Sequence, residues 1–228
     1  MMTNLFSTFD PATNMNLSMN WTSVLISFII MPTTYWVSLN RIIMLLSKII
    51  NSLNNEFKLL MGVNNKGMTI MGISLFMFIL FNNMMGLLPY IFTSSSHLAF
   101  TMTLALPLWL SIMMFGWFNH TNHMLAHLVP TGTPNILMPF MVLIETTSNL
   151  IRPGSLAVRL TANMIAGHLL MSLLGNNTMS ASSMTLTLIY LVQIMLMMFE
   201  MAVALIQAYV FSILSTLYAS EVMYEATQ

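Results

Sequence analysis

An arginine lies within a long apolar segment of this 228-residue chain. Arg159 lies within residues 135–174, which have the composition of a helix and contain few other charged side chains. A charged side chain at bilayer depth costs roughly 2.5–3.5 kcal/mol on insertion scales, and arginine cannot lose its proton to avoid that cost. Arg159 must therefore face a partner, a water-filled cavity or another protein, which makes it a candidate functional residue. The alternative is a structural arginine that is satisfied by carbonyl groups or reaches the membrane interface.

Other polar residues share the helical face of Arg159. Glu145, Arg152 and Arg159 are seven residues apart, and Asn163 follows four residues later. Seven residues at about 100° each return a side chain to within about 20° of its starting direction. A kink expected at Pro153 weakens the alignment for the two residues before it. The spacing nevertheless predicts a polar face on an otherwise apolar helix.

A second polar series lies on the last apolar segment. Gln193, Glu200 and Gln207 are again seven residues apart, among Met, Leu, Val and Ile. Interhelical hydrogen bonding is the alternative to a functional role for the two glutamines. Folding the chain into a hairpin centred near Met179 brings Glu200 to the depth of Arg159. A buried Arg159–Glu200 ion pair therefore competes with a functional role for both residues.

Together with His168, these residues have the chemistry of a proton path. Histidine accepts and donates protons near neutral pH, and a buried carboxyl group can do the same. Arg159 cannot relay protons, so it acts as a fixed positive barrier. A path with such a barrier in its middle consists of two half-paths, and no residue of this chain carries protons between them.

The composition identifies a membrane protein. Hydrophobic residues make up 57% of the chain and charged residues only 5%, whereas soluble domains carry about 25% charged residues. The net charge is zero, so we expect no nucleic acid partner, and the lack of cysteine excludes disulfides and thiolate metal sites. We predict no cofactor and no metal, because no carboxylate or cysteine lies near His120, His123 and His127 to complete a site.

The apolar segments predict an all-α polytopic protein with a single membrane domain over residues 1–228. After a polar N-terminus, 1–20, we expect five membrane helices and one surface helix. The membrane helices are predicted at 21–39, 68–88, 98–118, 135–174 and 184–218, with Pro139 and Pro153-Gly154 interrupting the fourth. The last two exceed the roughly 20 residues that a bilayer needs, so they should form a strongly tilted helical hairpin.

Residues 41–61 differ from these spans, because apolar residues recur there at helical spacing among Lys, Arg, Asn and Glu. The pattern predicts an amphipathic helix that lies on the membrane surface. Residues 40–67 hold four of the six Lys and Arg residues, so the positive-inside rule puts them on the matrix or cytoplasmic side. With five spans, the N-terminus then lies outside and the C-terminus in the matrix.

Two stretches of the hairpin resemble subunit a of the mitochondrial F-type ATP synthase. They are LAVRLTAN at 156–163 with AGHLL at 166–170, and EMAVALIQAYVF at 200–211. The order of an N-terminal span, a surface helix and a final long hairpin is also similar over nearly the whole chain. The 27 methionines agree with the coding bias of an animal mitochondrial genome, and an arthropod source is favoured.

The resemblance implies a mechanism. In this family, subunit a sits beside a rotating ring of c subunits, each with one carboxylate at mid-membrane. Arg159 matches the arginine that keeps the facing c carboxylate ionised and blocks a direct proton leak. His168 and Glu200 match positions of the inlet half-channel from the intermembrane space, and Glu145 matches one of the outlet half-channel to the matrix. The resemblance implies no role for Arg152.

The same resemblance assigns Asn163 and Gln207 to polar positions that line or support the path. It places Glu200 with His168 on the inlet side, whereas residue counting places Glu200 level with Arg159. The family placement is preferred, because residue counting assumes hairpin arms of equal geometry.

The predicted function is that of a proton-conducting stator subunit of the ATP synthase membrane sector, in the mitochondrial inner membrane. Such a subunit is not an enzyme on its own. The expected partners are the c ring, other membrane-sector and peripheral-stalk subunits, the lipid bilayer and protons. The alternatives are a stand-alone proton-coupled transporter or channel, and a structural or respiratory-complex subunit without a proton path. Co-purification with a c ring would distinguish the predicted stator subunit from these two alternatives.

Overall fold

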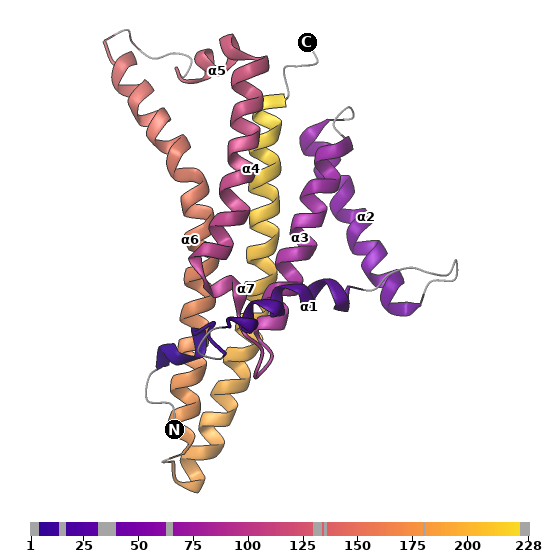
Figure 1. The fold of residues 1–228 in the computed structure, drawn as a ribbon, viewed down its shortest axis with the longest axis vertical. Helices are drawn as coiled ribbons and strands as arrows, with labels where there is room; N and C mark the ends of the chain where they lie inside the picture. The colour runs from indigo at the N-terminus through magenta and orange to yellow at the C-terminus, as the bar shows by residue number, and fades with distance from the viewer. Residues whose placement is uncertain are drawn as a thin grey trace.

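Long helices dominate the structure, a computed structural model of the chain. It describes residues 5–13, 17–31, 40–62, 66–129, 134, 136–179 and 181–223. The helices that run side by side are α3 (Lys66–Gly86), α4 (Leu98–Asn119), α6 (Met138–Thr178) and α7 (Ser183–Met223) (Figure 1). Each of these is long and apolar enough to cross a membrane. The chain is therefore a multi-pass, helical membrane protein.

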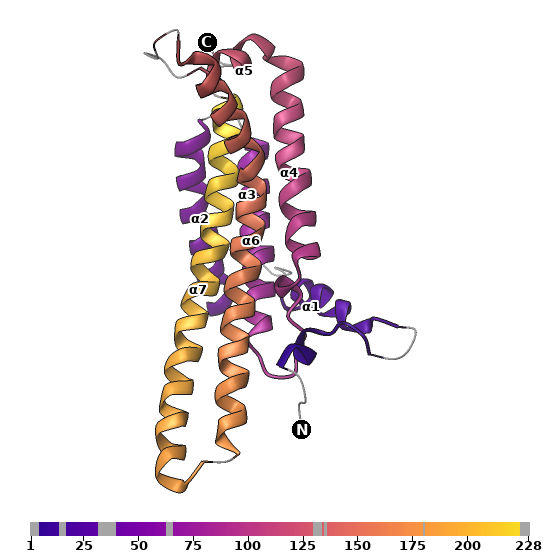
Figure 2. The same cartoon turned by 90° about the vertical axis from the view of Figure 1, so that its left-hand side faces the viewer.

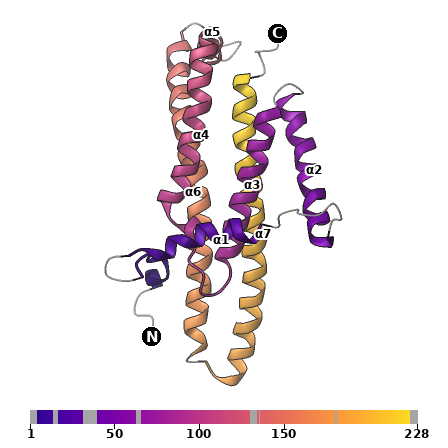
Figure 3. The same ribbon diagram turned by 45° about the vertical axis from the view of Figure 1, so that its right-hand side comes forward.

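The first predicted span, 21–39, is described only in part. Its described residues belong to the 3-10 helix η2 (Met19–Thr22) and to α1 (Ser23–Ile30), and residues 32–39 lie outside the described part of the chain. The 8 residues of α1 rise only about 12 Å, against roughly 30 Å for a bilayer core. α1 lies across the long helices rather than along them (Figures 1 and 3). A fifth membrane helix therefore stays a prediction.

α6 and α7 form the predicted hairpin, which projects beyond the other helices at its looped end (Figure 2). Pro139 is in the first turn of α6, where its missing N–H has no helical partner to lose. The predicted interruption at Pro153 is not observed, because α6 continues through it over 41 residues. The side chain of Pro153 is buried in the bundle, so packing stabilises the helix at this point.

α7 is central to the bundle and packs against α2, α3, α4 and α6. Its buried face consists largely of small residues, namely Ala204, Ala208, Ser212, Ser215, Thr216 and Ala219. Small side chains let helix backbones approach closely in a membrane. At the contact with α3, a Cβ on Gly72 would come within 2.8 Å of Thr216 Cγ2, so glycine is needed there.

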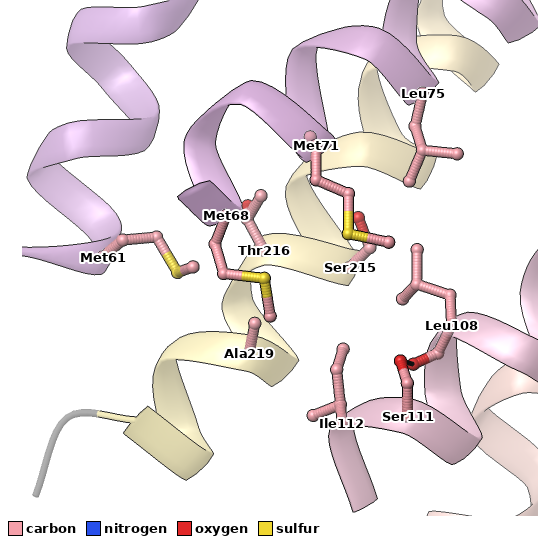
Figure 4. Close-up of a pocket in the computed structure, with 11 residues that line it drawn as sticks. Met61, Met68, Met71, Leu75, Leu108, Ser111, Ile112, Ser215, Thr216 and Ala219 are labelled. Atoms are coloured by element: carbon pink, nitrogen blue, oxygen red, sulfur yellow. Dashed lines mark hydrogen bonds between the residues drawn. The ribbon is translucent and has the colours of Figure 1, made fainter. Parts of the chain in front are cut away.

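Methionines fill the junction of α2, α3, α4 and α7. Figure 4 shows Met61, Met68 and Met71 around Ser215 and Ala219 of α7. The flexible thioether adapts to an irregular gap. The pocket that remains has a volume of about 20 Å³, which is enough for little more than one water molecule.

The amphipathic segment forms α2 (Arg41–Met61), which packs along α3 and α7. Its inner face buries Leu53, Phe57 and Met61, which are four residues apart and so lie on one side of the helix. The hydroxyl group of Tyr209, on α7, donates a hydrogen bond of 2.9 Å to Glu56 Oε2. These contacts dock α2 onto the bundle, and its position relative to the membrane surface stays a prediction.

Three short helices complete the described part of the chain. They are η1 (Leu5–Phe9), η3 (Ser94–Ser96) and α5 (Thr121–His127). η1 lies against α6, and η3 contacts α3, α4 and α6. α5 lies between the predicted spans 98–118 and 135–174, and it contacts α4.

Candidate functional site

The hairpin of α6 and α7 borders a cavity of about 430 Å³. Its polar lining residues are Asn163 on α6 and Glu200 and Gln207 on α7, and the other walls are apolar or formed by Gly167. Glu200 is only 8% exposed, and neither of its carboxyl oxygens has a hydrogen-bond partner within the described residues. A buried carboxyl group needs a polar partner, which the described residues do not supply. Three of the predicted site residues therefore meet at one cavity.

Glu200 lies opposite Gly167. A Cβ at position 167 would come within 2.7 Å of the Glu200 carboxyl carbon, so glycine lets the carboxyl group lie this close to α6. Residue counting from the hairpin loop predicts that Glu200 lies level with Arg159, and this prediction is wrong because the two arms are staggered. The described ion pairs do not include an Arg159–Glu200 pair. Glu200 instead lies beside the position that precedes His168.

His168 faces the N-terminal segment. The ring of Phe9, on η1, meets the His168 ring edge-on, with 6.3 Å between the two centroids. His97 Nε2 donates a hydrogen bond of 2.8 Å to the carbonyl oxygen of Phe9, which holds η1 in this place. His168 Nε2 is buried without a hydrogen-bond partner within the described residues. His168 thus lies next to the Glu200 cavity without lining it.

Arg159 is exposed on the outer face of α6. Ala157 and Leu160 are at most 2% exposed and face the core, whereas Val158 is 50% exposed and faces away with Arg159. Within the described residues, the ion pairs are those of Arg152, and none involves Arg159. The described part of the chain thus supplies no ion-pair partner for a permanent charge on a membrane-spanning helix. Such a charge requires a partner from outside the chain.

Glu145 lies at a second cavity, of about 340 Å³. Arg152 forms ion pairs with two carboxylates there: its Nη2 lies 3.3 Å from Glu145 Oε1, and its Nη1 lies 3.3 Å from Glu221 Oε2 on α7. The guanidinium carbon of Arg152 is also 5.2 Å from the centre of the Tyr218 ring. Glu145 and Arg152 therefore share a face of α6, as their spacing predicts.

Glu221 is a candidate residue that the sequence reasoning missed. It lies 21 residues after Glu200, so it continues the seven-residue series of Gln193, Glu200 and Gln207 on α7. The series passes through Leu214, which interrupts the polar pattern. Continuing the count beyond this leucine would have found Glu221.

Arg159 lies between the two cavities along α6. It is 14 residues from Glu145 and 8 residues from Gly167, or about 21 Å and 12 Å at about 1.5 Å per residue. The nearest lining residues of the two cavities on α6 are Arg152 and Asn163, which lie on either side of Arg159 and are about 17 Å apart along the helix. Groups that can exchange protons therefore lie on both sides of a fixed positive charge. Within the described ranges, no three His, Asp or Glu residues cluster as metal ligands.

Comparison with known proteins gives one consistent result. The sequence model of the family described as ATP synthase A chain matches residues 15–220. The chain is 61% identical to ATP synthase subunit a of Aedes aegypti over 225 residues, covering 97% of this chain and 100% of that protein. It is 59% identical to the subunits of Locusta migratoria and Drosophila melanogaster, over 224 and 223 residues, with the same coverage. These insect relatives and the family match show that the chain belongs to the ATP synthase A chain family.

Proposed function

We propose that this membrane-sector subunit of ATP synthase conducts protons as the stator of the mitochondrial enzyme. In this proposal, Arg159 faces a rotating ring of c subunits, each of which carries one carboxylate. Glu200 and His168 belong to the inlet half-channel from the intermembrane space, and Glu145 belongs to the outlet half-channel to the matrix. Arg159 attracts each ionised c carboxylate and prevents protons from passing directly between the half-channels.

The observation that carries this proposal is the exposed charge of Arg159, which has no ion-pair partner among the described residues and lies between two cavities that each contain carboxyl groups. A structural arginine would be expected to pair within its own chain, as Arg152 does. Asn163 and Gln207 add amide groups to the Glu200 cavity, where they can orient water or a c carboxylate. Val158, Ala162 and Asn163 beside Arg159 are exposed as well, so this part of α6 is open to a helical partner in the membrane.

The two half-channels convert the membrane potential into directed motion. One elementary charge that moves through the potential yields about 2.3 kcal/mol per 100 mV. Because Arg159 blocks direct proton transfer between the cavities, a proton must be carried from one cavity to the other on the carboxyl group of a c subunit. The subunit itself makes and breaks only bonds to transferred protons, so ATP chemistry takes place on other subunits of the complex.

We place the subunit in the mitochondrial inner membrane, with its N-terminus toward the intermembrane space and its C-terminus toward the matrix. The insect relatives and the methionine-rich composition support this compartment. η1 lies toward the looped end of the hairpin, and α7 ends at the opposite end of the bundle (Figure 1). The Glu200 cavity then opens on the intermembrane side and the Glu145 cavity on the matrix side.

The test is ATP-driven proton pumping by intact ATP synthase that carries Arg159→Ala, reconstituted into liposomes. We expect pumping to be lost, because the counter-charge and the barrier are both removed. Arg159→Lys should also fail, since a compact ammonium group does not reproduce the planar guanidinium. Arg41→Ala, which removes an exposed arginine from α2, serves as the control.

Normal pumping in the Arg159→Ala enzyme would refute the proposed function. Purification of the complex through this subunit supplies a second test, because a c ring must accompany it. A subunit that conducts protons without a c ring would instead be a stand-alone channel or transporter.

A further inference from the structure

An aromatic contact from the N-terminal segment restrains the ring of His168. The Nε2 atom of His168 is buried and has no hydrogen-bond partner within the described residues. The Phe9 ring meets the imidazole ring edge-on, with 6.3 Å between the centroids and 89° between the ring planes, which is a favoured arrangement for aromatic pairs. η1, which carries Phe9, lies against α6. Phe9 therefore contacts a residue of the proposed inlet from outside the hairpin.

We propose that Phe9 is a positioning residue of the proton inlet, and that His97 keeps it in place. Phe9 fixes the orientation of the His168 ring, so that the ring can pass protons toward the Glu200 cavity. This inference rests on the proposed function, because it concerns the proton transfer assigned there to His168. It extends the inlet from the hairpin to the N-terminal segment.

The ring of His168 needs such a contact, because the torsion that turns an imidazole ring about its Cβ–Cγ bond has broad minima. A proton moves only between groups within hydrogen-bond reach, about 2.6–3.2 Å apart or linked by one water molecule. His168 lies next to the Glu200 cavity without lining it, so the direction of its ring nitrogens determines whether they reach water there. Phe9 limits the rotation and offers no competing hydrogen bond, because its side chain is apolar.

The backbone of Phe9 is held by His97. His97 Nε2 donates a hydrogen bond of 2.8 Å to the Phe9 carbonyl oxygen. The His97 ring packs against Trp21 of η2 and against Phe92, with centroid distances of 5.3 Å and 5.2 Å. Trp21 and Phe92 also contact each other, at 5.7 Å. This three-ring cluster fixes the direction in which His97 donates its hydrogen bond.

A second contact holds the chain directly after η1. Asn20 Nδ2 donates a hydrogen bond of 3.2 Å to the carbonyl oxygen of Asp10, and the Ala12 N–H group donates one of 3.0 Å to Asp10 Oδ1. These bonds, like that of His97, do not involve the side chain of Phe9. Substitution of this side chain should therefore leave η1 in place, so the effect of the ring can be measured apart from that of the anchor.

The proton transfer that depends on this orientation balances without a further reactant. A proton from water on the intermembrane side forms an N–H bond on His168. An N–H bond of the resulting imidazolium then breaks, and water passes the proton to the Glu200 carboxylate, where an O–H bond forms. The electron pair of the broken bond stays on nitrogen, so His168 returns to its neutral form. Phe9 touches no transferred proton and acts only by positioning.

The test is the rate of ATP synthesis by intact ATP synthase with Phe9→Leu, in liposomes at low driving force, divided by the amount of assembled enzyme. Leucine keeps an apolar side chain and the backbone bond to His97 but has no ring. We expect the rate to fall about two- to tenfold, the range for loss of an edge-on aromatic pair. Phe9→Tyr keeps the ring and should match the wild type. Phe6→Leu is the matched control, because Phe6 lies on η1 and is 69% exposed.

The solvent isotope effect on the same rate distinguishes positioning from a purely structural role. If Phe9→Leu slows proton transfer at His168, this transfer limits the rate more strongly, so the ratio of rates in light and heavy water should rise. A structural role would lower the yield of assembled enzyme and leave the ratio unchanged. A wild-type rate with Phe9→Leu, a lower rate with an unchanged ratio, or an equal loss with Phe6→Leu would each overturn the inference.

Variants of His97 test the anchor. His97→Leu removes the donor and keeps the Phe9 ring, so synthesis should slow and the isotope effect should rise as with Phe9→Leu. His97→Gln supplies an amide N–H donor and should recover part of the lost rate. A wild-type rate with His97→Leu would overturn the part assigned to His97.

Arg159→Ala in the same preparations separates the two proposals. Coupled synthesis in that variant would mean that the stator function itself fails. A loss of synthesis with Arg159→Ala, together with a wild-type rate and isotope effect for Phe9→Leu, would overturn the role of Phe9 alone.

Discussion

Replacing Gly167 by alanine tests whether the close approach of α6 to Glu200 sets the position of a carboxyl group that we propose for the inlet. The added Cβ would lie 2.7 Å from the Glu200 carboxyl carbon, about 0.8 Å inside a normal contact of roughly 3.5 Å. The carboxyl group ends a flexible side chain and borders the 430 Å³ cavity, so it can turn aside without separating the helices. Overpacking lowers the free energy of unfolding by about 1–3 kcal/mol in a packed core. Because the Glu200 carboxyl group can turn aside, we expect a loss at the lower end of that range.

Gly167→Ala should lower the rate of proton conduction more than it lowers the amount of assembled subunit. A displacement of about 1 Å in a reacting group can cost up to about 100-fold in rate. For a shift of about 0.8 Å, with water in the cavity to bridge part of the gap, we expect proton conduction to fall about tenfold. The amount of assembled subunit should stay close to that of the wild type.

The assay is passive proton conduction through the membrane sector after removal of the catalytic sector. A potassium diffusion potential drives protons into liposomes, a pH-sensitive dye records their uptake, and the rate is divided by the amount of subunit present. Gly175→Ala is the matched control, because it adds the same methyl group to the same helix with no atom within 4 Å.

Wild-type conduction by a fully assembled Gly167→Ala enzyme would refute the reasoning. It would show that Glu200 need not occupy its observed position for protons to enter. An equal loss of conduction in the Gly175→Ala control would also refute it, since the effect would then come from changed helix stiffness and not from contact with Glu200.

Two further predictions concern the segments that dock onto the hairpin. His97→Leu removes the hydrogen bond to the Phe9 carbonyl group, so η1 should open about two- to tenfold more often. Limited proteolysis within η1 measures this opening, and an unchanged cleavage rate would contradict the prediction. Tyr209→Phe removes the hydrogen bond to Glu56, which contributes about 0.5–1.5 kcal/mol. Amide hydrogen exchange in α2 should therefore accelerate while exchange in α3 does not, and equal protection in both enzymes would show that apolar packing alone holds α2.

The positions of the long helices follow closely from the sequence. Hydropathy predicts spans at 68–88 and 98–118, and the structure has α3 at Lys66–Gly86 and α4 at Leu98–Asn119. Apolar helices of this length differ sharply in composition from the loops between them, so hydropathy finds them well. The continuity of α6 through Pro153 was not predictable, because the buried contacts that offset the lost hydrogen bond come from distant residues.

The candidate site was only partly predictable, for a physical reason. Spacing on one helix fixes which side chains share a face, and the contact between Glu145 and Arg152 follows from their separation of seven. The register between two helices depends instead on side-chain volumes where they touch. Glycine at 167 lets Glu200 approach α6 at that point, and residue counting from the loop contains no information about such a contact.

The different surroundings of the two arginines on α6 follow from the proposed mechanism. Arg152 and Arg159 are seven residues apart, yet α7 supplies Glu221 and Tyr218 to the first, whereas the described ion pairs include none with the second. A carboxylate on a moving ring must be attracted by an arginine and then released. An internal carboxylate bonded to Arg159 would compete with each arriving c subunit and would weaken the barrier. Arg152 instead has its two carboxylate partners within the chain, on both arms of the hairpin. One arginine therefore has to be free for a partner that moves, and the other has to be held by partners that do not.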